Sequence, residues 1–282
     1  MAEVITAKTA GFCFGVKKAV DKAFEMAETG KEIYTYGPVI HNDEVVGELK
    51  AKGVKVLNSE EELSSISSGT VILRSHGVSR HIMELLEEKN IDYVDVTCPF
   101  VKRIHDIVDE KSKDHQIVIV GNPNHPEVEG IVGWCRNGAT VISGTEEAEA
   151  FKPDSDLPVC VVSQTTFNFK KFKEIVEIFS RKLYNCNIVN TICNATEKHQ
   201  AEAREIAGAV DTMIVIGDTK SSNSRKLYEI CKERCANTYF VQTLEDLKLQ
   251  KCRPVGSIGI TAGASTPNNI IEEVQNYVRN DI

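Results

Sequence analysis

The sequence predicts an α/β fold that is built from three similar repeats. Short apolar runs alternate with helical patterns along the chain, as expected for parallel α/β layers. The same order of strand, cysteine and helix recurs at Cys13, Cys98 and Cys193, which lie 85 and 95 positions apart. Matching polar positions follow at similar offsets in all three repeats, which favours one repeated architecture.

The clearest copy surrounds Cys98. Residues 93–96 are predicted to form a strand, and Pro99 fits the first position of a helix, where its missing N–H costs nothing. Four residues spaced as on one buried helix face follow: Val101, Ile104, His105 and Val108. Cys98 is therefore expected at a helix N-terminus, where backbone N–H groups and the helix dipole favour a thiolate. For one isolated copy, a cysteine that only fills space is the alternative.

The other elements are expected in the same order in each repeat. The strands before the cysteines are residues 4–6, 93–96 and 188–190, and the helix after the third cysteine is a polar one over 194–207. Strands that end in glycine are predicted at 33–37, 117–121 and 213–217. Third strands that lead into acidic turns cover 54–61, 141–147 and 239–246. Fourth strands with polar loops cover 71–76, 161–166 and 258–265, and the last helices cover 78–89, 169–183 and 268–279.

Polar residues stand at the ends of two strands in each repeat. Four residues after the glycines are His41, His125 and Ser221. The loops after the fourth strands contribute His76, Thr165 and Ser265. Because ligands of parallel α/β sheets bind outside the carboxyl ends of the strands, we expect these residues to surround the three cysteines. The alternative is three ordinary α/β domains whose strand ends happen to be polar.

Composition limits the class of protein. The 282 residues carry a formal net charge of −8, which argues against a protein that binds nucleic acid through its phosphates. No apolar run reaches the roughly 18 residues of a membrane span, and the first residues do not have the pattern of a signal peptide. An odd number of cysteines, nine, fits a disulfide framework poorly, and free cysteines are typical of a reducing compartment. We therefore expect a cytoplasmic protein without membrane or nucleic-acid partners.

Three converging cysteines suit a metal centre. A closed zinc site takes four nitrogen or sulfur ligands, which three thiolates and a histidine would supply. Iron–sulfur clusters are normally held by four thiolates, so three would leave one iron without a protein ligand. That iron can bind a substrate oxygen. The spacing, without any Cys-x-x-Cys pair, favours the cluster, but zinc stays open on the residues alone.

The polar residues indicate an anionic substrate. Short donors that suit a phosphate or diphosphate are His41, His76, Ser221, Ser222, Asn223 and Ser265. Helix capping is the alternative for the serines. Glu127, two positions after His125, would have a raised pKa if shielded from water and would then donate protons, with His125 as a relay. A carboxylate that only favours a helix start is the alternative.

Nine motifs in this order resemble those of the LytB family, the 4-hydroxy-3-methylbut-2-enyl diphosphate reductases. They are residues 11–16, 37–42, 74–77, 95–99, 121–127, 163–166, 191–193, 221–224 and 261–265. They extend over nearly the whole chain, and no functional position departs from the family pattern. The segments 144–157 and 231–253 carry no motif, and the resemblance assigns no role to Cys135, Cys160, Cys186, Cys231, Cys235 or Cys252.

The resemblance implies three pseudo-threefold-related α/β domains with small, parallel-rich sheets around one central [4Fe–4S] cluster per chain. The domains would be residues 14–97, 98–192 and 193–282, with the N-terminal strand 1–13 packed on the last. The implied activity removes the hydroxyl of 4-hydroxy-3-methylbut-2-enyl diphosphate with two electrons and two protons. The products, isopentenyl and dimethylallyl diphosphates, complete the non-mevalonate isoprenoid pathway.

The resemblance also implies residue roles. Cys13, Cys98 and Cys193 would hold the cluster, and ferredoxin or flavodoxin would donate electrons. The residues implied to hold the diphosphate are His41, His76, Ser221, Ser222, Asn223 and Ser265. Thr165, His125 and Glu127 would surround the reacting hydroxyl, with Glu127 delivering protons. Two other classes stay open: a non-redox iron–sulfur dehydratase, and a metal-based anion sensor.

Overall fold

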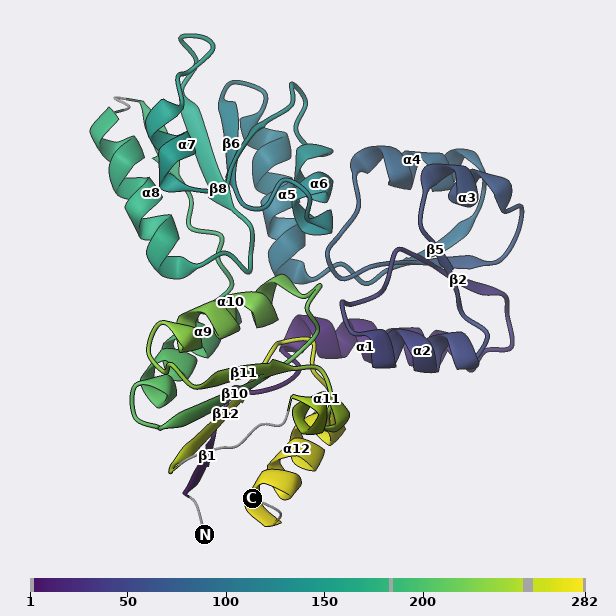
Figure 1. Cartoon of the computed structure of the whole chain (residues 1–282). Coiled ribbons are helices and arrows are strands. Elements are labelled where there is room, and N and C mark those ends of the chain that lie inside the picture. Colours follow the sequence, from purple (N-terminus) through teal and green to yellow (C-terminus); the bar gives the residue numbers. More distant parts are fainter. Residues whose placement is uncertain (1–2, 183–184, 251–255, 281–282) are drawn as a thin grey trace. The chain divides into compact units, whose positions relative to one another are not determined.

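Three four-stranded sheets with the same strand order form the fold (Figure 1). The computed structural model describes residues 3–182, 185–250 and 256–280. The first sheet contains β2 (Ile33–Tyr36), β3 (Lys55–Leu57), β4 (Thr70–Leu73) and β5 (Asp92–Asp95), in the order β3-β2-β4-β5. All of its pairings are parallel.

The other two sheets repeat this order. The second contains β6 (Gln116–Val120), β7 (Thr140–Ile142), β8 (Val159–Ser163) and β9 (Cys186–Ile188), in the order β7-β6-β8-β9. The third contains β10 (Thr212–Ile216), β11 (Thr238–Val241), β12 (Ile258–Ala262) and β1 (Val4–Thr6), in the order β11-β10-β12-β1. The first strand of the chain thus pairs with the last, with Val4 opposite Ile258. The predicted α/β class with three small parallel sheets is confirmed.

Four helices accompany each sheet. The helices that follow the cysteines are α1 (Phe14–Ala27), α5 (Pro99–Lys111) and α9 (Asn194–Ala207). Those that follow the glycine-ended strands are α2 (Asp43–Ala51), α6 (Pro126–Val132) and α10 (Ser222–Lys232). The short ones are α3 (Glu60–Ser65), α7 (Thr145–Ala150) and α11 (Leu244–Leu249). The last of each repeat are α4 (Arg80–Glu88), α8 (Phe169–Lys182) and α12 (Asn268–Asn280).

The described residues group into two compact units. Unit 1 takes its residues from 1–17, 41–45 and 193–282, and it contains the third sheet. Unit 2 takes its residues from 18–40 and 46–192, and it contains the first and second sheets.

The second sheet shows how the strands place the helices. Val118, Val120 and Val161 pack with α8, while Ile117, Ile119 and Val162 pack on the other face with α5 and α6 (Figure 1). Successive side chains of a strand point to opposite faces, so a strand covered by helices on both sides is apolar throughout. Helix α6 follows β6 directly and therefore starts at the carboxyl end of this sheet.

Two predictions of local structure are wrong. The strand expected at 188–190 lies two residues earlier, as β9. The three acidic turns are the six-residue helices α3, α7 and α11. Ser59 accepts a hydrogen bond from the N–H of Glu62, and Thr243 forms a reciprocal capping box with Asp246. These caps and the acidic first turns stabilise helices where the sequence pattern indicates only turns.

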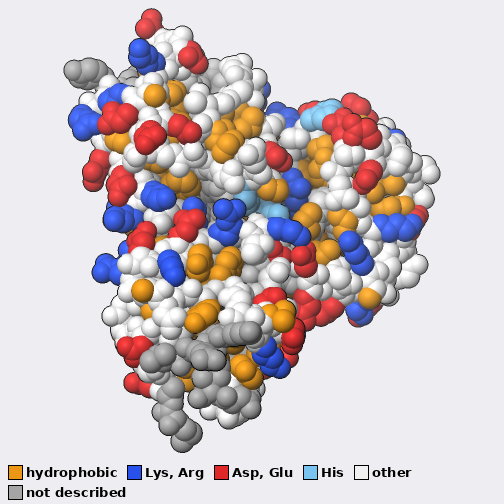
Figure 2. Space-filling view, viewed as in Figure 1, with side chains coloured by type: hydrophobic (Ala, Val, Ile, Leu, Met, Phe, Trp, Pro, Cys, Tyr) orange, Lys and Arg blue, Asp and Glu red, His pale blue; other side chains and the backbone are white. Residues whose placement is uncertain are grey.

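The surface agrees with the acidic composition. Figure 2 shows basic and acidic side chains mixed across the visible face, with small apolar areas between them. On this face of the described part, the basic side chains form no continuous stripe. None of the helices in the described ranges has the length and hydropathy that crossing a bilayer requires.

Candidate active site

The three repeated cysteines occupy the same structural position. Cys98 and Cys193 are the N-caps of α5 and α9. Cys13 directly precedes α1, and its carbonyl oxygen accepts a hydrogen bond from the N–H of Lys17 at 2.9 Å. All three are partly exposed. Each cysteine therefore lies directly before the first turn of a helix.

Two of these cysteines interact within unit 1. Burial raises the pKa of Cys13, and the negative charge of Cys193 raises it further, whereas hydrogen bonds from the N–H groups of Val16 and Gly15 lower it. The helix N-terminus thus favours the thiolate as the sequence suggests, but burial outweighs it. Two adjacent thiols become thiolates together when a cation neutralises their charge, so the pair fits a metal centre.

Other cysteines have the chemistry of neutral, space-filling side chains. Burial raises the pKa of Cys135 and of Cys231 to about 12, and that of Cys160 to about 11. Cys231 and Cys235 also direct their Sγ atoms at backbone carbonyl oxygens. None of the described cysteines forms a disulfide. These three high pKa values make Cys135, Cys160 and Cys231 poor candidates for thiolate ligands.

The polar loop of unit 1 has an unused amide. Asn223 is 4% exposed, and neither its Oδ1 nor its Nδ2 has a hydrogen-bond partner among the described residues. A buried amide without partners is costly, so this side chain fits a ligand that would supply them. Ser221 has a capping role as well, because its Oγ accepts from the N–H of Ser224 at 3.3 Å. Ser265 Oγ lies 3.2 Å from Ser221 Oγ, which joins the two loops.

Two glycines bring the strand ends onto this loop. A Cβ atom on Gly217 or on Gly263 would overlap the side chain of Ser224. Gly217 directly follows β10, and Gly263 directly follows β12. Gly263 therefore allows a close approach of the loop after β12 to the start of α10.

The sequence analysis missed Asp218, a buried carboxylate at the end of β10. Its Oδ2 accepts from the N–H of Asp43 at 3.3 Å, and its Oδ1 accepts from the N–H of Lys220 at 2.7 Å. The Lys220 Nζ also pairs with the Asp43 carboxylate at 3.0 Å. Asp218 thus joins the segment that follows His41 to the loop that precedes Ser221. An aspartate directly after a strand-end glycine was the only signal in the sequence.

In unit 2, Thr165 holds the carboxyl group of Glu127. The backbone N–H of Thr165 donates to Glu127 Oε1 at 2.6 Å, and its Oγ1 donates to Oε2 at 2.7 Å. Glu127 is 1% exposed. Burial raises its pKa to about 7, even though both hydrogen bonds from Thr165 lower it. Glu127 can therefore exchange a proton near neutral pH, as the sequence analysis expects for a shielded carboxyl.

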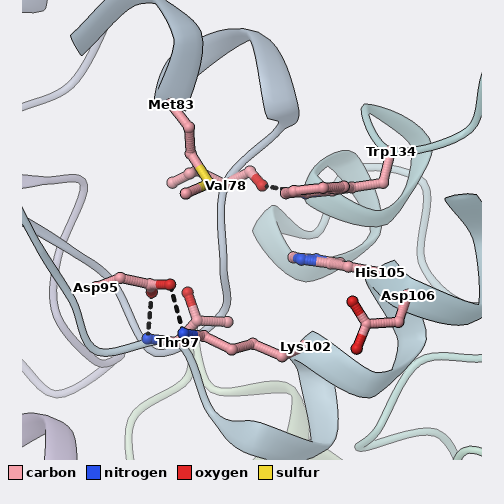
Figure 3. Close-up of a pocket in the computed structure, with 8 residues that line it drawn as sticks. All are labelled: Val78, Met83, Asp95, Thr97, Lys102, His105, Asp106 and Trp134. Carbon is pink, nitrogen blue, oxygen red and sulfur yellow. Dashed lines mark hydrogen bonds and ion pairs between the residues drawn. The ribbon is translucent and has the colours of Figure 1, made fainter. Parts of the chain in front are cut away.

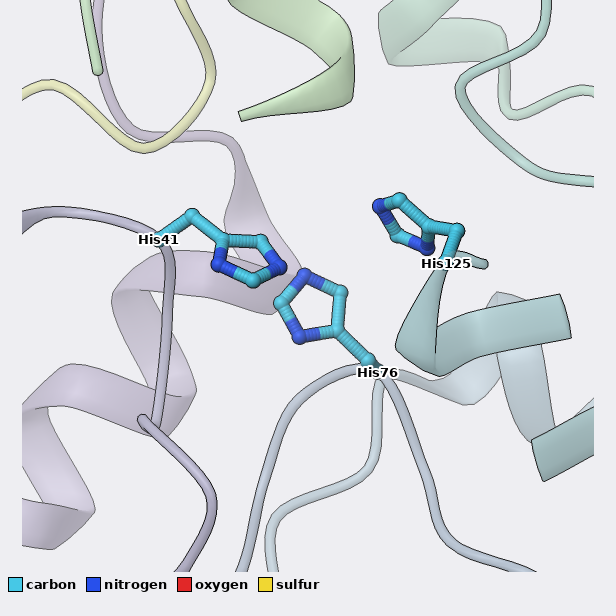
Figure 4. Close-up of side chains that lie close together, drawn as sticks. All are labelled: His41, His76 and His125. Carbon is cyan, nitrogen blue, oxygen red and sulfur yellow. The ribbon is translucent and has the colours of Figure 1, made fainter. Parts of the chain in front are cut away.

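His125 and His76 lie together at the start of α6, the helix that contains Glu127 (Figure 4). His125 is the N-cap of α6, and its Nδ1 accepts from the N–H of Glu127 at 3.1 Å. This geometry assigns the proton of the neutral ring to Nε2. The rings of His76 and His125 meet edge to face, with centroids 5.5 Å apart.

The structure brings the predicted site residues together in two groups. Unit 1 contains Cys13, His41, Cys193, Ser221, Ser222, Asn223 and Ser265. Unit 2 contains His76, Cys98, His125, Glu127 and Thr165. Within unit 1, electrostatic and hydrogen-bond interactions link Cys13 with Cys193 and Ser221 with Ser265. Within unit 2 they link His76 with His125 and Glu127 with Thr165.

Comparison with known proteins gives one consistent family. The family model described as LytB protein matches residues 4–279. The 4-hydroxy-3-methylbut-2-enyl diphosphate reductase of Caldanaerobacter subterraneus subsp. tengcongensis is 44% identical over 279 residues, covering 96% of this chain and 95% of that protein. The protein of the same name from Clostridioides difficile is 42% identical, covering 97% and 98%.

Two solved structures are also similar. The E-1-hydroxy-2-methyl-but-2-enyl-4-diphosphate reductase from Plasmodium falciparum has a TM-score of 0.90 at 27% identity, covering 99% of this chain and 87% of that one. A second, described as (E)-4-hydroxy-3-methyl-but-2-enyl diphosphate reductase, the terminal enzyme of the non-mevalonate pathway, has a TM-score of 0.68 at 40% identity, with full coverage of both chains. The resemblance expected from the nine motifs is confirmed.

Proposed function

The chain belongs to the LytB family of reductases, and we propose that it reduces 4-hydroxy-3-methylbut-2-enyl diphosphate to isopentenyl and dimethylallyl diphosphates. In this reaction the carbon–oxygen bond of the hydroxyl group breaks and a carbon–hydrogen bond forms. Two electrons and two protons enter, and one water leaves. The proposal therefore needs an electron source, a diphosphate site and a proton donor.

For the electron source, we propose a [4Fe–4S] cluster on Cys13, Cys98 and Cys193. When bound, it would supply electrons and an open iron, because three thiolates leave one iron without a protein ligand. The shared position of the three cysteines before helices supports this set, as does the effect of the Cys193 charge on the pKa of Cys13. Zinc supplies no electrons for a reduction, so family membership favours the cluster. Ferredoxin or flavodoxin is the proposed electron donor.

For the diphosphate, we propose a set of six polar residues. They are His41, His76, Ser221, Ser222, Asn223 and Ser265. The unpaired, buried amide of Asn223 is the strongest support, since an anion would satisfy its Nδ2. Hydrogen bonds to a charged group typically contribute about 1.5–3 kcal/mol each. Asn223→Ala is therefore expected to weaken substrate binding by roughly ten- to a hundredfold.

The observation that carries the proposal is the Glu127 carboxyl group. It is buried, oriented by Thr165 through two hydrogen bonds, and has a pKa of about 7. A hydroxyl is a poor leaving group, so its departure needs a positioned acid. Protonated Glu127 would supply that proton, Thr165 would orient it, and His125 would lie beside the reacting hydroxyl.

Anaerobic turnover with a chemical electron donor tests the proposed function. We expect both isoprenyl diphosphates to form, with two electrons consumed per substrate. A non-redox dehydratase would consume the substrate without the donor, and an anion sensor would bind it without product. Either outcome would refute the proposed reduction.

We also propose the domain boundaries 14–97, 98–192 and 193–282, with residues 1–13 packed on the last domain. The pairing of β1 with β12 supports the last part of this division. A cytoplasmic location is proposed as well, supported by nine cysteines in a chain whose proposed cofactor needs reducing conditions.

A further inference from the structure

The loop that carries His76 packs tightly against α5. Gly77 has a φ of +77°, and a Cβ atom there would lie 2.6 Å from His105 Cε1 and 3.2 Å from Thr97 Cγ2. Only glycine fits this backbone conformation at such a distance. The imidazole of His105 is therefore the surface against which the turn after His76 rests.

The C-terminal end of α6 holds the same loop from another side. A Cβ atom on Gly133 would overlap the side chain of Ser79. The next residue, Trp134, donates a hydrogen bond from its Nε1 to the carbonyl oxygen of Val78 at 2.9 Å. This bond joins positions 56 residues apart. Helix α6 starts directly after its N-cap, His125, and contains Glu127. At its C-terminal end, Trp134 thus holds the backbone of Val78, two residues after His76.

The Trp134 ring is itself held in place. It stacks on His105 at 5.1 Å between centroids and 14° between planes, and the Arg80 guanidinium lies 4.8 Å from its centroid. Arg80 is in turn paired with Asp109 at 2.6 Å. Burial lowers the pKa of His105 to about 4, so the stacked imidazole is uncharged at neutral pH. These contacts hold the indole ring in the orientation in which its Nε1–H points at the carbonyl oxygen of Val78.

A cavity beside the loop makes this bond important. It has a volume of about 220 Å³ and is lined by Val78, Met83, Thr97, His105 and Trp134 among others (Figure 3). Close packing against neighbours normally fixes a loop, but here one side of Val78 faces open space. The hydrogen bond from Trp134 therefore carries more of the positioning than it would in a filled core.

We propose that Trp134, stacked on His105 and bonded to Val78, is a positioning residue that holds His76 in place beside His125 for the substrate's diphosphate. This inference rests on the proposed function. Trp134, His105 and Val78 are not among the residues proposed to bind the diphosphate or the cluster. It predicts that disturbing the indole N–H changes anion affinity more than the chemical step.

Trp134→Phe tests the inference, because it keeps an aromatic ring and removes the donor. We expect the dissociation constant for inorganic diphosphate, measured by calorimetry on the anaerobic holoenzyme, to rise about two- to tenfold, as for one lost neutral hydrogen bond. KM should rise equally, kcat should stay within about twofold, and amide exchange should accelerate at 75–79. The control is Tyr277→Phe, which removes a hydroxyl from a ring that also has a cation, Lys248, beside it.

If amide exchange were faster in Trp134→Phe but diphosphate affinity and KM were unchanged, the hydrogen bond from Trp134 to Val78 would only stabilise the loop. That result would overturn the inference. A second measurement needs no variant, because Trp134 is the single tryptophan of the chain. The fluorescence of Trp134 should change as inorganic diphosphate is added to the parent protein, and the titration should give the same dissociation constant as calorimetry. A titration without any change in fluorescence would contradict the proposal. Failure of the proposed function is distinguishable, because the parent itself would then not reduce the substrate, whatever its affinity for diphosphate.

Discussion

At the residue scale, Glu127 is subject to two opposing influences. Removal from water favours the neutral acid, while two hydrogen bonds from Thr165 favour the carboxylate. The balance leaves the pKa of Glu127 at about 7, against 4.5 for an ordinary glutamate. An acid near neutral pH is matched to proton donation under physiological conditions.

Glu127→Gln keeps the shape of this side chain and removes the acid. We expect normal iron content, near-normal substrate binding and turnover lowered by about a hundredfold or more, within the usual range for a positioned acid. Steady-state reduction with a chemical donor measures this. Glu129→Gln, an exposed change two residues along the same helix, is the matched control. Near-parental turnover of Glu127→Gln with full iron would place the proton donor elsewhere.

The pH profile tests the same group independently. Glu127 donates in its protonated form, so kcat should fall as the pH rises through about 7. Thr165→Val removes one bond that stabilises the carboxylate, so the pKa of Glu127 should rise and the falling limb should move to higher pH. Thr165→Ser keeps the hydroxyl and should leave the limb in place. A limb that stays fixed in Thr165→Val would show that another group titrates.

At the element scale, the strand-end loops of unit 1 depend on one buried carboxylate. Asp218 uses its two oxygens to accept separate backbone N–H groups, those of Asp43 and Lys220. An amide offers only one oxygen, so one bond must be lost in Asp218→Asn.

In Asp218→Asn we expect KM to rise by about two- to tenfold, the effect of about one hydrogen bond, with kcat nearly unchanged. The control is Asp211→Asn at the other end of β10, where the carboxylate also accepts a backbone N–H, that of Ser257 at 2.9 Å. Equal effects of both substitutions on KM would show a general loss of stability. If neither substitution changed KM, the proposed role of Asp218 would be wrong.

Elements with a clear local pattern could be predicted from the sequence. The polar helix over 194–207 is present as expected, and Pro99 opens α5 with Val101, Ile104 and Val108 buried. The three short acidic helices were missed, because six residues are too few to show a helical period. Their signal is in the caps, Ser59 and Thr243, which serve equally well in turns.

At the scale of the whole molecule, repetition is what made the fold predictable. One strand, cysteine and helix pattern is weak evidence, but three at matching offsets support each other, and the three sheets have the same strand order. Individual hydrogen bonds between distant segments could not be predicted. The bond from Trp134 to Val78 and that from Asp43 to Asp218 join positions 56 and 175 residues apart, without any local pattern.

The central proposal is that Cys13, Cys98 and Cys193 hold one iron–sulfur cluster. Iron content per chain, measured after anaerobic purification, tests it most directly. We expect about four irons in the parent, in Cys186→Ser and in Cys235→Ser. In Cys13→Ser, Cys98→Ser and Cys193→Ser we expect the iron to be lost or only weakly retained. Zinc in the parent, or full iron in any of these last three variants, would contradict the account.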